Sequence, residues 1–139
     1  MNEGIQFKTK VHFRGGHQGR KRLRVGKPPV PKPSGRVPLV SRLMALAIHF
    51  DRLLQSGEVR DQASLAAVGH VTRARVTQIM NLLQLAPDIQ EEILFLPKTE
   101  KGRDAVREGD LRPITMTLDW KKQRQMWRLM KAAIELKAN

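Results

Sequence analysis

The sequence contains no cysteine and no tyrosine, and four Phe and two Trp supply all of its aromatic residues. The absence of cysteine excludes disulfides, thiol catalysis and zinc fingers, because each of these needs the sulfur atom. The absence of tyrosine excludes DNA strand transfer through a tyrosine nucleophile. Disulfide-stabilised proteins, thiol enzymes, zinc fingers and tyrosine recombinases are therefore excluded.

Long apolar segments are missing as well. The longest uninterrupted apolar run, Leu43 to Ile48, spans six residues, whereas a membrane-spanning helix needs roughly 20. The N-terminus also lacks the apolar stretch of a secretory signal. From these absences we expect a cytoplasmic protein that makes no use of a membrane.

What the chain has in excess is positive charge, with a formal net charge of +13 at pH 7. Residues 1–40 carry ten Lys or Arg against one acid, residues 41–112 carry ten of each sign, and residues 113–139 carry six against two. Such a field attracts polyanions, and nucleic acid is the most common polyanion. The distribution predicts a neutral folded region between two basic ends.

Residues 1–37 are predicted to form a disordered basic arm. Five of the ten glycines and four of the eight prolines lie between positions 8 and 37, a composition that favours loose or extended backbone and offers little apolar surface. The arm contains a cationic cluster expected to grip phosphates: Arg20, Lys21, Arg22 and Arg24. A solubilising tail is the alternative interpretation, because charge blocks are often simply solvated.

Helical periodicity begins after the arm and predicts an all-α fold. Apolar residues follow Pro38 at spacings of three and four as far as Leu54, and Gly57 is placed to end that helix. Further helices are predicted over 61–68, 72–85, 88–95 and 119–137, with a polar loop at 98–110. We therefore expect a small helical bundle over 38–97, followed over 98–139 by a linker and a C-terminal amphipathic helix. No persistent strand alternation and no internal repeat is evident.

The segment Gln62–Leu83 has the spacing of a helix-turn-helix. Ala66 is the small residue that lets the second helix pack closely across the first. Gly69-His70 forms the turn, and Val76 and Ile79 anchor the second helix to the core. In this motif the second helix is the one that lies in a DNA major groove.

A projection of 72–85 at 100° per residue separates two sides of this helix. The core side is predicted to comprise Thr72, Val76, Ile79, Met80 and Leu83. The outward side comprises Ala74, Thr77, Gln78 and Asn81, flanked by Arg73 and Arg75. Gln and Asn can pair with adenine edges, Thr can touch a thymine methyl, and Arg can reach phosphate or guanine. The alternative is that these polar residues are only the solvated side of an amphipathic helix.

The run from Leu65 through Leu96 resembles the helix-turn-helix domain of the ParB/KorB partition and plasmid-regulator proteins. The part TRARVTQIMNLLQLAPDIQEEIL is similar to their recognition helix, followed by a Leu-Leu step and a short helix after proline. The segment Glu108–Ile114, EGDLRPI, resembles the family's segment in which a glycine and an arginine introduce another helix. The positions that match the family's DNA-facing residues are Thr72, Arg73, Ala74, Thr77, Gln78 and Asn81.

The resemblance covers roughly residues 38–125 and implies an all-α bundle that reads DNA, often as a pair of subunits on a palindrome. Two features depart from the family pattern. The glycine expected in the turn lies one position early, with His70 in its place. Nothing upstream resembles the nucleotide-binding domain of full ParB proteins, so no nucleotide and no other cofactor is expected.

The C-terminal helix carries two adjacent stripes. The basic stripe consists of Lys121, Arg124, Arg128 and Lys131, and the apolar stripe of Trp120, Trp127, Met130 and Ile134. An apolar stripe on a helix packs against another surface, so it is expected to lie on the chain's own bundle or on a second subunit in a homodimer. Lys121, Arg124 and Arg128 are predicted to contact DNA phosphates.

No catalytic constellation is found, and an enzyme is not expected. The serines at 34, 41, 56 and 64 have no obvious base near them in sequence, and the four histidines have no metal-ligand spacing. The acidic pairs Glu91/Glu92 and Asp104/Glu108 could hold Mg²⁺, but their setting favours solvated surface. No metal site is therefore predicted.

Together these features predict a sequence-specific duplex DNA-binding protein, associated with a plasmid, a phage or a recombinase and located at the nucleoid. Two alternatives stay open. One is an RNA-binding or ribosome-associated basic protein, for which a basic arm would serve equally well. The other is an adaptor that recruits a recombinase or a partition ATPase.

Overall fold

The computed structural model describes residues 10–15, 21–26 and 34–138. The chain divides into two units, Met1–Ser34 and Gly35–Asn139, here called the N-terminal unit and the helical unit. The predicted boundary between arm and bundle, at residues 37 and 38, lies close to this division.

The described part of the N-terminal unit is a two-stranded antiparallel hairpin of β1, Val11–Gly15, and β2, Lys21–Val25. Val11 pairs with Val25 and Phe13 with Leu23. The sequence did not predict these strands, because apolar and basic residues alternate over only five positions in each strand, too few for a clear period. Residues 1–9, 16–20 and 27–33 of the predicted arm lie outside the described residues.

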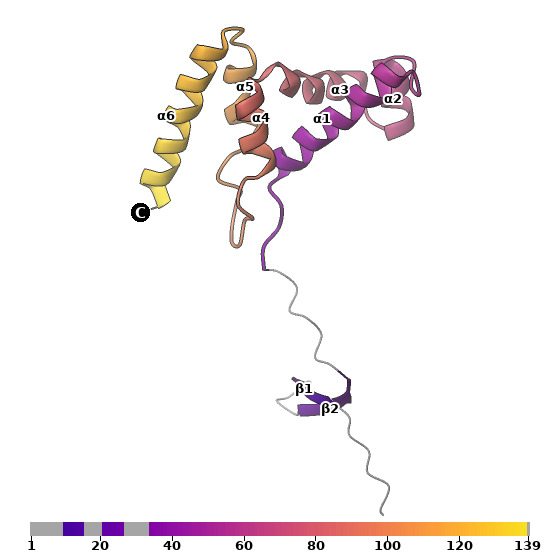
Figure 1. The fold of residues 1–139 in the computed structure, drawn as a ribbon, viewed down its shortest axis with the longest axis vertical. Helices are drawn as coiled ribbons and strands as arrows, with labels where there is room; N and C mark the ends of the chain where they lie inside the picture. The colour runs from indigo at the N-terminus through magenta and orange to yellow at the C-terminus, as the bar shows by residue number, and fades with distance from the viewer. Residues whose placement is uncertain (1–9, 16–20, 27–33, 139) are drawn as a thin grey trace, which may run out of the picture. The chain divides into compact units, whose positions relative to one another are not determined.

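The helical unit confirms the predicted all-α bundle. Its elements are α1 Leu39–Ser56, α2 Gln62–Gly69, α3 Arg73–Met80, the 3₁₀ helix η2 Asn81–Gln84, α4 Pro87–Leu94, α5 Glu108–Thr115 and α6 Trp120–Ala138. The α2–α3 pair and α6 lie at opposite ends of the bundle, with α1, α4 and α5 between them (Figure 1).

Helix α1 begins and ends as its sequence predicts. Pro38 precedes it with φ −56°, an angle that the proline ring favours at a helix start. Gly57 ends it in the left-handed conformation at φ 79°, and its N–H donates to the Leu54 carbonyl. Because a left-handed residue without Cβ carries no steric penalty, glycine suits this position.

Two apolar clusters hold the bundle together. The main core joins α1, the α3–η2 region, α4, α5 and α6, and its buried members are Val40, Leu43, Met44, Ala47, Ile79, Leu82, Leu85, Ala86, Ile89, Ile93, Val106, Leu111, Ile114 and Trp127. The small core lies between α1, α2 and α3, and its buried members are Leu65, Ala66 and Val76. The helix-turn-helix is therefore attached to the bundle through both clusters.

The third helix is shorter than predicted. It ends at Met80 rather than near Leu85, and the chain continues as η2. A 3₁₀ helix advances about 120° per residue instead of 100°, so the inward positions shift by one. Leu82 is buried for this reason, whereas Leu83, which the projection placed inward, is only partly buried.

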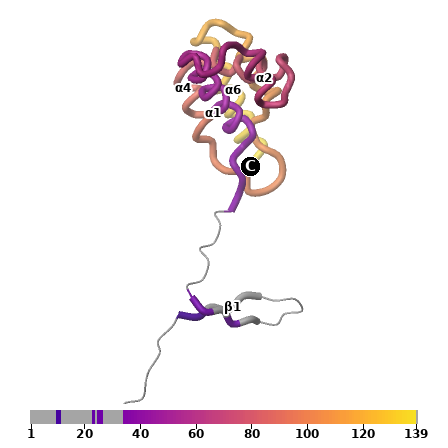
Figure 2. Tube along the Cα trace, turned by 90° about the vertical axis from the view of Figure 1, so that its right-hand side faces the viewer, coloured from indigo at the N-terminus to yellow at the C-terminus, as the bar shows by residue number. Residues whose placement is uncertain are grey.

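The predicted linker at 98–110 contains the start of a helix, because α5 begins at Glu108. The segment before it forms a loop that projects from the helices in both views (Figure 1, Figure 2). Arg36 and Thr99 pair their backbones at the base of this loop. Because α5 and α6 contribute Leu111 and Trp127 to the main core, the boundary predicted after Pro97 does not separate two units.

A buried glutamine attaches α6 to the bundle. Gln123 is fully buried, and its Oε1 accepts from the Ala86 N–H at 2.8 Å. Its Nε2 donates to the carbonyls of Gln84 at 3.1 Å and Thr117 at 2.7 Å. Three backbone groups near the η2–α4 junction and the α5–α6 turn are thereby satisfied, and sequence reasoning had not singled out this residue.

Candidate nucleic-acid interface

Helix α2 forms because its start is well capped. The Asp61 Oδ1 accepts from the Ser64 N–H at 2.8 Å and from the Ser64 hydroxyl at 2.9 Å, an N-cap that satisfies a donor without a helical partner. These hydrogen bonds lower the pKa of Asp61. Leu65 and Ala66 face the small core, as the motif requires of the small residue at position 66.

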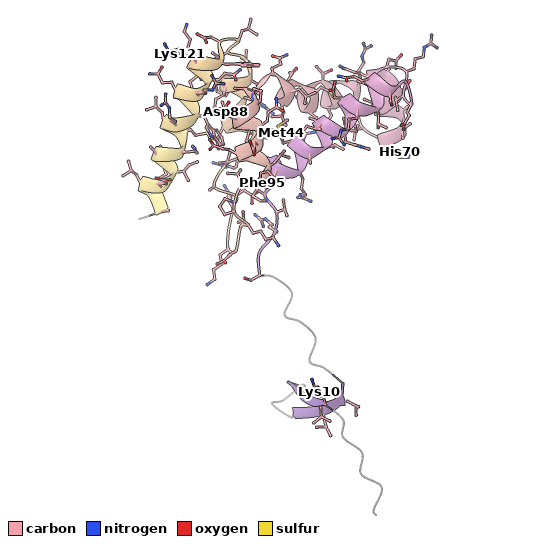
Figure 3. The ribbon with its side chains drawn as sticks, viewed as in Figure 1. Lys10, Met44, His70, Asp88, Phe95 and Lys121 are labelled. Atoms are coloured by element: carbon pink, nitrogen blue, oxygen red, sulfur yellow. The ribbon has the colours of Figure 1, made fainter. Side chains whose placement is uncertain are left out.

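The predicted turn between α2 and α3 is centred on His70. Gly69 is the last residue of α2, and His70 alone takes the left-handed conformation, with φ 53° and ψ 38°. The N–H groups of Val71 and His70 donate to the carbonyls of Ala66 and Ala67, the hydrogen-bond pattern of a Schellman motif. His70 thus fills the position that glycine usually occupies, at the far end of α2 (Figure 3).

Helix α3 is capped at its start and anchored along one side. The Thr72 hydroxyl accepts from the Arg75 N–H at 3.1 Å. Val76 is fully buried in the small core, and Ile79 is 4% exposed in the main core. Both predicted anchors therefore lie where the motif places them.

The opposite side of this helix is open to solvent. All of the predicted family-matched positions are exposed: Thr72, Arg73, Ala74, Thr77, Gln78 and Asn81. Among the described residues none pairs with the Arg73 guanidinium, although its charge contributes to the lowered pKa of Asp61. The Thr77 hydroxyl lies 3.2 Å from Gln62 Oε1 and 3.1 Å from the Arg73 carbonyl oxygen.

Arg75, the other predicted flanking arginine, differs from Arg73 because it pairs with a carboxylate. Its Nη1 donates to Glu108 Oε1 at 2.6 Å and to Gln78 Oε1 at 3.2 Å. The Arg75 and Glu108 side chains are 33% and 20% exposed, so this ion pair is partly shielded from water. The sequence predicted that Arg75 is free to contact DNA. It did not predict the ion pair with Glu108, which lies 33 residues further along the chain.

A surface hollow of about 250 Å³ lies between α3–η2 and α5. Its polar lining includes Gln78, Asn81 and Glu108, and Leu82 and Leu111 contribute apolar lining. Residues of α5 therefore share one surface with the exposed residues of α3. In the sequence, the segment EGDLRPI predicted another helix after the motif. It did not predict that this helix contacts Arg75.

The cations predicted on α6 divide into two kinds. Arg124 Nε lies 3.1 and 2.9 Å from the two carboxylate oxygens of Asp88, which lowers the pKa of Asp88 and raises that of Arg124. Within the described ranges, Lys121 and Arg128 have exposed side chains and no ion pair. Lys121 and Asp88 lie at the α6 end of the bundle (Figure 3).

The apolar stripe of α6 lies mainly on the chain's own bundle. Trp127 is buried in the main core, and Met130 and Ile134 pack against it, whereas Trp120 is 48% exposed. The indole N–H of Trp127 and the Lys131 ammonium both donate to Glu92 Oε2. Hydrogen bonds from Lys131 and then Trp127 lower the pKa of Glu92.

The expectation that the acidic pairs are solvated surface is wrong for Asp104 and Glu108, whose side chains are only 12% and 20% exposed. Glu92 is exposed but pairs with Lys131. Asp104 accepts from the Leu39 N–H at 3.0 Å, from the Thr99 hydroxyl at 2.7 Å and from Arg36 Nη2 at 3.1 Å. These contacts, with the Leu39 N–H first, lower the pKa of Asp104 to about 2. Asp104 therefore joins the loop to the start of α1.

The N-terminal cations can be placed only in part. Lys21, Arg22 and Arg24 belong to β2, but their side chains lie outside the described residues, as does Arg20 as a whole. In the ranges that the structure describes, no three acidic, His or Cys residues are grouped to hold a metal ion. No helix there is long and apolar enough to cross a membrane.

Comparison of the chain with protein-family models, with curated proteins and with solved structures gave no match. The resemblance to ParB/KorB proteins therefore stays a prediction from the sequence motif.

Proposed function

We propose that the protein binds duplex DNA with sequence preference, through the exposed side of α3. The observation that carries this proposal is the division of one short helix into two sides. Val76 and Ile79 are buried, while Thr77 and Gln78 of the same helix, and Asn81 at the start of η2, are exposed. A helix held rigidly by its inner side, with amides and cations outside, has the properties of a recognition helix in a major groove.

Three of the exposed side chains have a stated role in this proposal. Gln78 and Asn81 contact base edges, because an amide carries both a donor and an acceptor. Arg73, which has no partner among the described residues, contacts a phosphate. The net charge of +13 provides the long-range attraction that makes such contacts form quickly.

The other basic segments supply phosphate contacts without choosing a sequence. In the N-terminal unit these are Arg20, Lys21, Arg22 and Arg24, and on α6 they are Lys121 and Arg128. Arg124 and Arg75, both predicted to bind DNA, are assigned lesser roles because each is held by a carboxylate of the bundle.

The biological setting that we propose is a plasmid-, phage- or recombinase-associated regulator of the ParB/KorB-like type, in the cytoplasm at the nucleoid. It acts without catalysis and without a cofactor. A homodimer on a palindromic site, and a recombinase or partition partner, belong to the same proposal. The motif resemblance and the exposed α3 residues support it.

The test compares Gln78→Ala and Asn81→Ala with Gln125→Ala, which removes an exposed amide on α6. A preferred duplex is first selected from a random pool, and each variant is titrated on it and on a scrambled duplex. We expect each of the first two variants to lose about 1–3 kcal/mol on the preferred duplex only, while Gln125→Ala keeps the wild-type ratio. An unchanged ratio in both would contradict the proposal, and tighter binding to structured RNA at the same salt would favour an RNA-binding protein.

A further inference from the structure

One nitrogen atom connects α5 to the exposed side of α3. Arg75 Nη1 donates to Glu108 Oε1 at 2.6 Å and to Gln78 Oε1 at 3.2 Å. A guanidinium nitrogen of this kind carries two hydrogens, so it can serve both acceptors at once. The three side chains form a chain of contacts that begins on α5 and ends at a proposed base-reading residue.

The chemistry of arginine determines how the Gln78 amide is oriented. Arginine has only donors, so the amide oxygen and not the NH₂ group must face it. The Gln78 NH₂ group is then the part of the amide that remains free of this contact. In a major groove its hydrogens match acceptors, such as N7 of either purine, O6 of guanine or O4 of thymine.

We propose that Glu108 is a positioning residue for DNA recognition, which holds Arg75 against α5 and through it fixes the Gln78 amide. This inference rests on the proposed function. It makes Arg75 a support for a base contact rather than a phosphate contact, unlike Arg73 on the same helix. The base preference of α3 therefore depends on a helix outside the helix-turn-helix.

The partial burial of the pair favours this role over a chance surface contact. Glu108 is 20% exposed and Arg75 33% exposed, so water and salt screen their attraction less than that of a fully exposed pair. The same glutamate lines the surface hollow together with Gln78 and Asn81. Glu108 thus lies beside the recognition surface and restrains one of its side chains.

The main test is Glu108→Gln, with Glu91→Gln as the matched control. Both variants remove one negative charge, but Glu91 is exposed on α4 and none of the described residues pairs with it. In Glu108→Gln the freed Arg75 reaches a phosphate, so the slope of log affinity against log salt steepens by about 0.9. The affinity ratio between preferred and scrambled duplex falls about fivefold or more, the lower end of what one good base contact contributes. Glu91→Gln changes neither quantity.

A charge-swapped double variant separates positioning from a structural role. Arg75→Glu with Glu108→Arg restores an ion pair between α3 and α5, but a carboxylate at position 75 has no hydrogen to donate to Gln78. We expect the double variant to regain the melting temperature of the wild type and not its duplex ratio. A double variant that recovers both would overturn the positioning role.

A measurement without DNA completes the test. The side-chain amide signals of Gln78 in the free full-length protein should shift in Glu108→Gln and stay in place in Glu91→Gln. Unshifted signals, or an affinity that rises equally on both duplexes, would overturn the inference. If Gln78→Ala lowers the duplex ratio while Glu108→Gln does not, only this inference fails. If Gln78→Ala leaves the ratio intact, the proposed function fails with it.

Discussion

The two ends of the bundle are built differently. At the α2–α3 end the buried cluster comprises only Leu65, Ala66 and Val76, and the polar side of α3 is open to solvent. At the α6 end Trp127 enters the main core and Gln123 makes three buried hydrogen bonds. The α6 end has the features of a structural support, and the α2–α3 end those of a presenting surface.

Both ends carry cations that pair with a carboxylate and cations that do not. On α6, Arg124 pairs with Asp88 and Lys131 with Glu92, because α4 presents carboxylates to that helix. On α3, Arg73 has no acidic neighbour within pairing distance among the described residues, while Arg75 pairs with Glu108. A basic stripe on a helix is therefore ambiguous in sequence, since its role depends on which acidic residues the fold brings against it.

The largest expected effect compares two tryptophans of α6. Trp127 is 2% exposed and Trp120 is 48% exposed. We expect Trp127→Ala to lower the free energy of unfolding by about 3–5 kcal/mol, because it removes a buried aromatic side chain and leaves a cavity. Trp120→Ala should cost far less. Urea unfolding of the two variants measures this, and equal losses would mean that α6 does not support the bundle through Trp127. Sedimentation of the same variants tests whether Trp120 contributes to a homodimer.

The next effect concerns the buried glutamine. Gln123→Ala leaves the Ala86 N–H and the carbonyls of Gln84 and Thr117 without their side-chain partner. A buried polar group without a partner costs about 1–3 kcal/mol, so we expect the free energy of unfolding to fall by more than about 2 kcal/mol. Gln125→Ala, an exposed position on the same helix, serves as the control. Matching unfolding curves for the two variants would show that the network contributes nothing.

A smaller effect is expected on the salt dependence of DNA binding, where Arg73 on α3 is compared with Arg124 on α6. Arg73→Ala should flatten the slope of log affinity against log salt by about 0.9, the contribution of one phosphate contact. Arg124→Ala should change the slope less, because Asp88 already engages that guanidinium. Titrations on a scrambled duplex at several salt concentrations give both slopes. A larger change for Arg124→Ala would reverse the assignment of the two ends.

The smallest effect is a pH dependence of the stability that the ion pairs of α6 provide. The pKa values of Asp88 and Glu92 are lowered from 3.8 and 4.5, chiefly by hydrogen bonds from Arg124 and Lys131. A carboxyl whose pKa is lower in the folded state adds stability above its ordinary pKa, and that stability is lost as the pH falls below it. The wild type should therefore melt above the variant Asp88→Asn/Glu92→Gln near neutral pH, and the difference should shrink below about pH 4. A difference in melting temperature that is the same at every pH would contradict a stabilising role for these ion pairs.

Local patterns in the sequence were enough to predict most of the helical fold. The spacing of Leu39 to Leu54, the cap at Thr72 and the proline at 87 each act within a few residues, and the helices beside them form as predicted. The predictions that were wrong concern the end of α3 and the start of α5, and the short strands β1 and β2 were not predicted. In the first of these, a switch from α to 3₁₀ geometry moved the buried position from Leu83 to Leu82.

The sequence by itself determined most of the helices, the buried anchors Val76 and Ile79, and the basic character of the chain. These follow from periodicity, capping and composition, which involve neighbours within one or two helical turns. Only the tertiary structure decided which charged residues meet. Glu108 contacts Arg75 across 33 positions of sequence, and Arg124 contacts Asp88 across 36. Patterns within one or two helical turns cannot predict contacts at such separations. Whether a cation is available to a phosphate or held by the protein itself is therefore a property of the packed bundle.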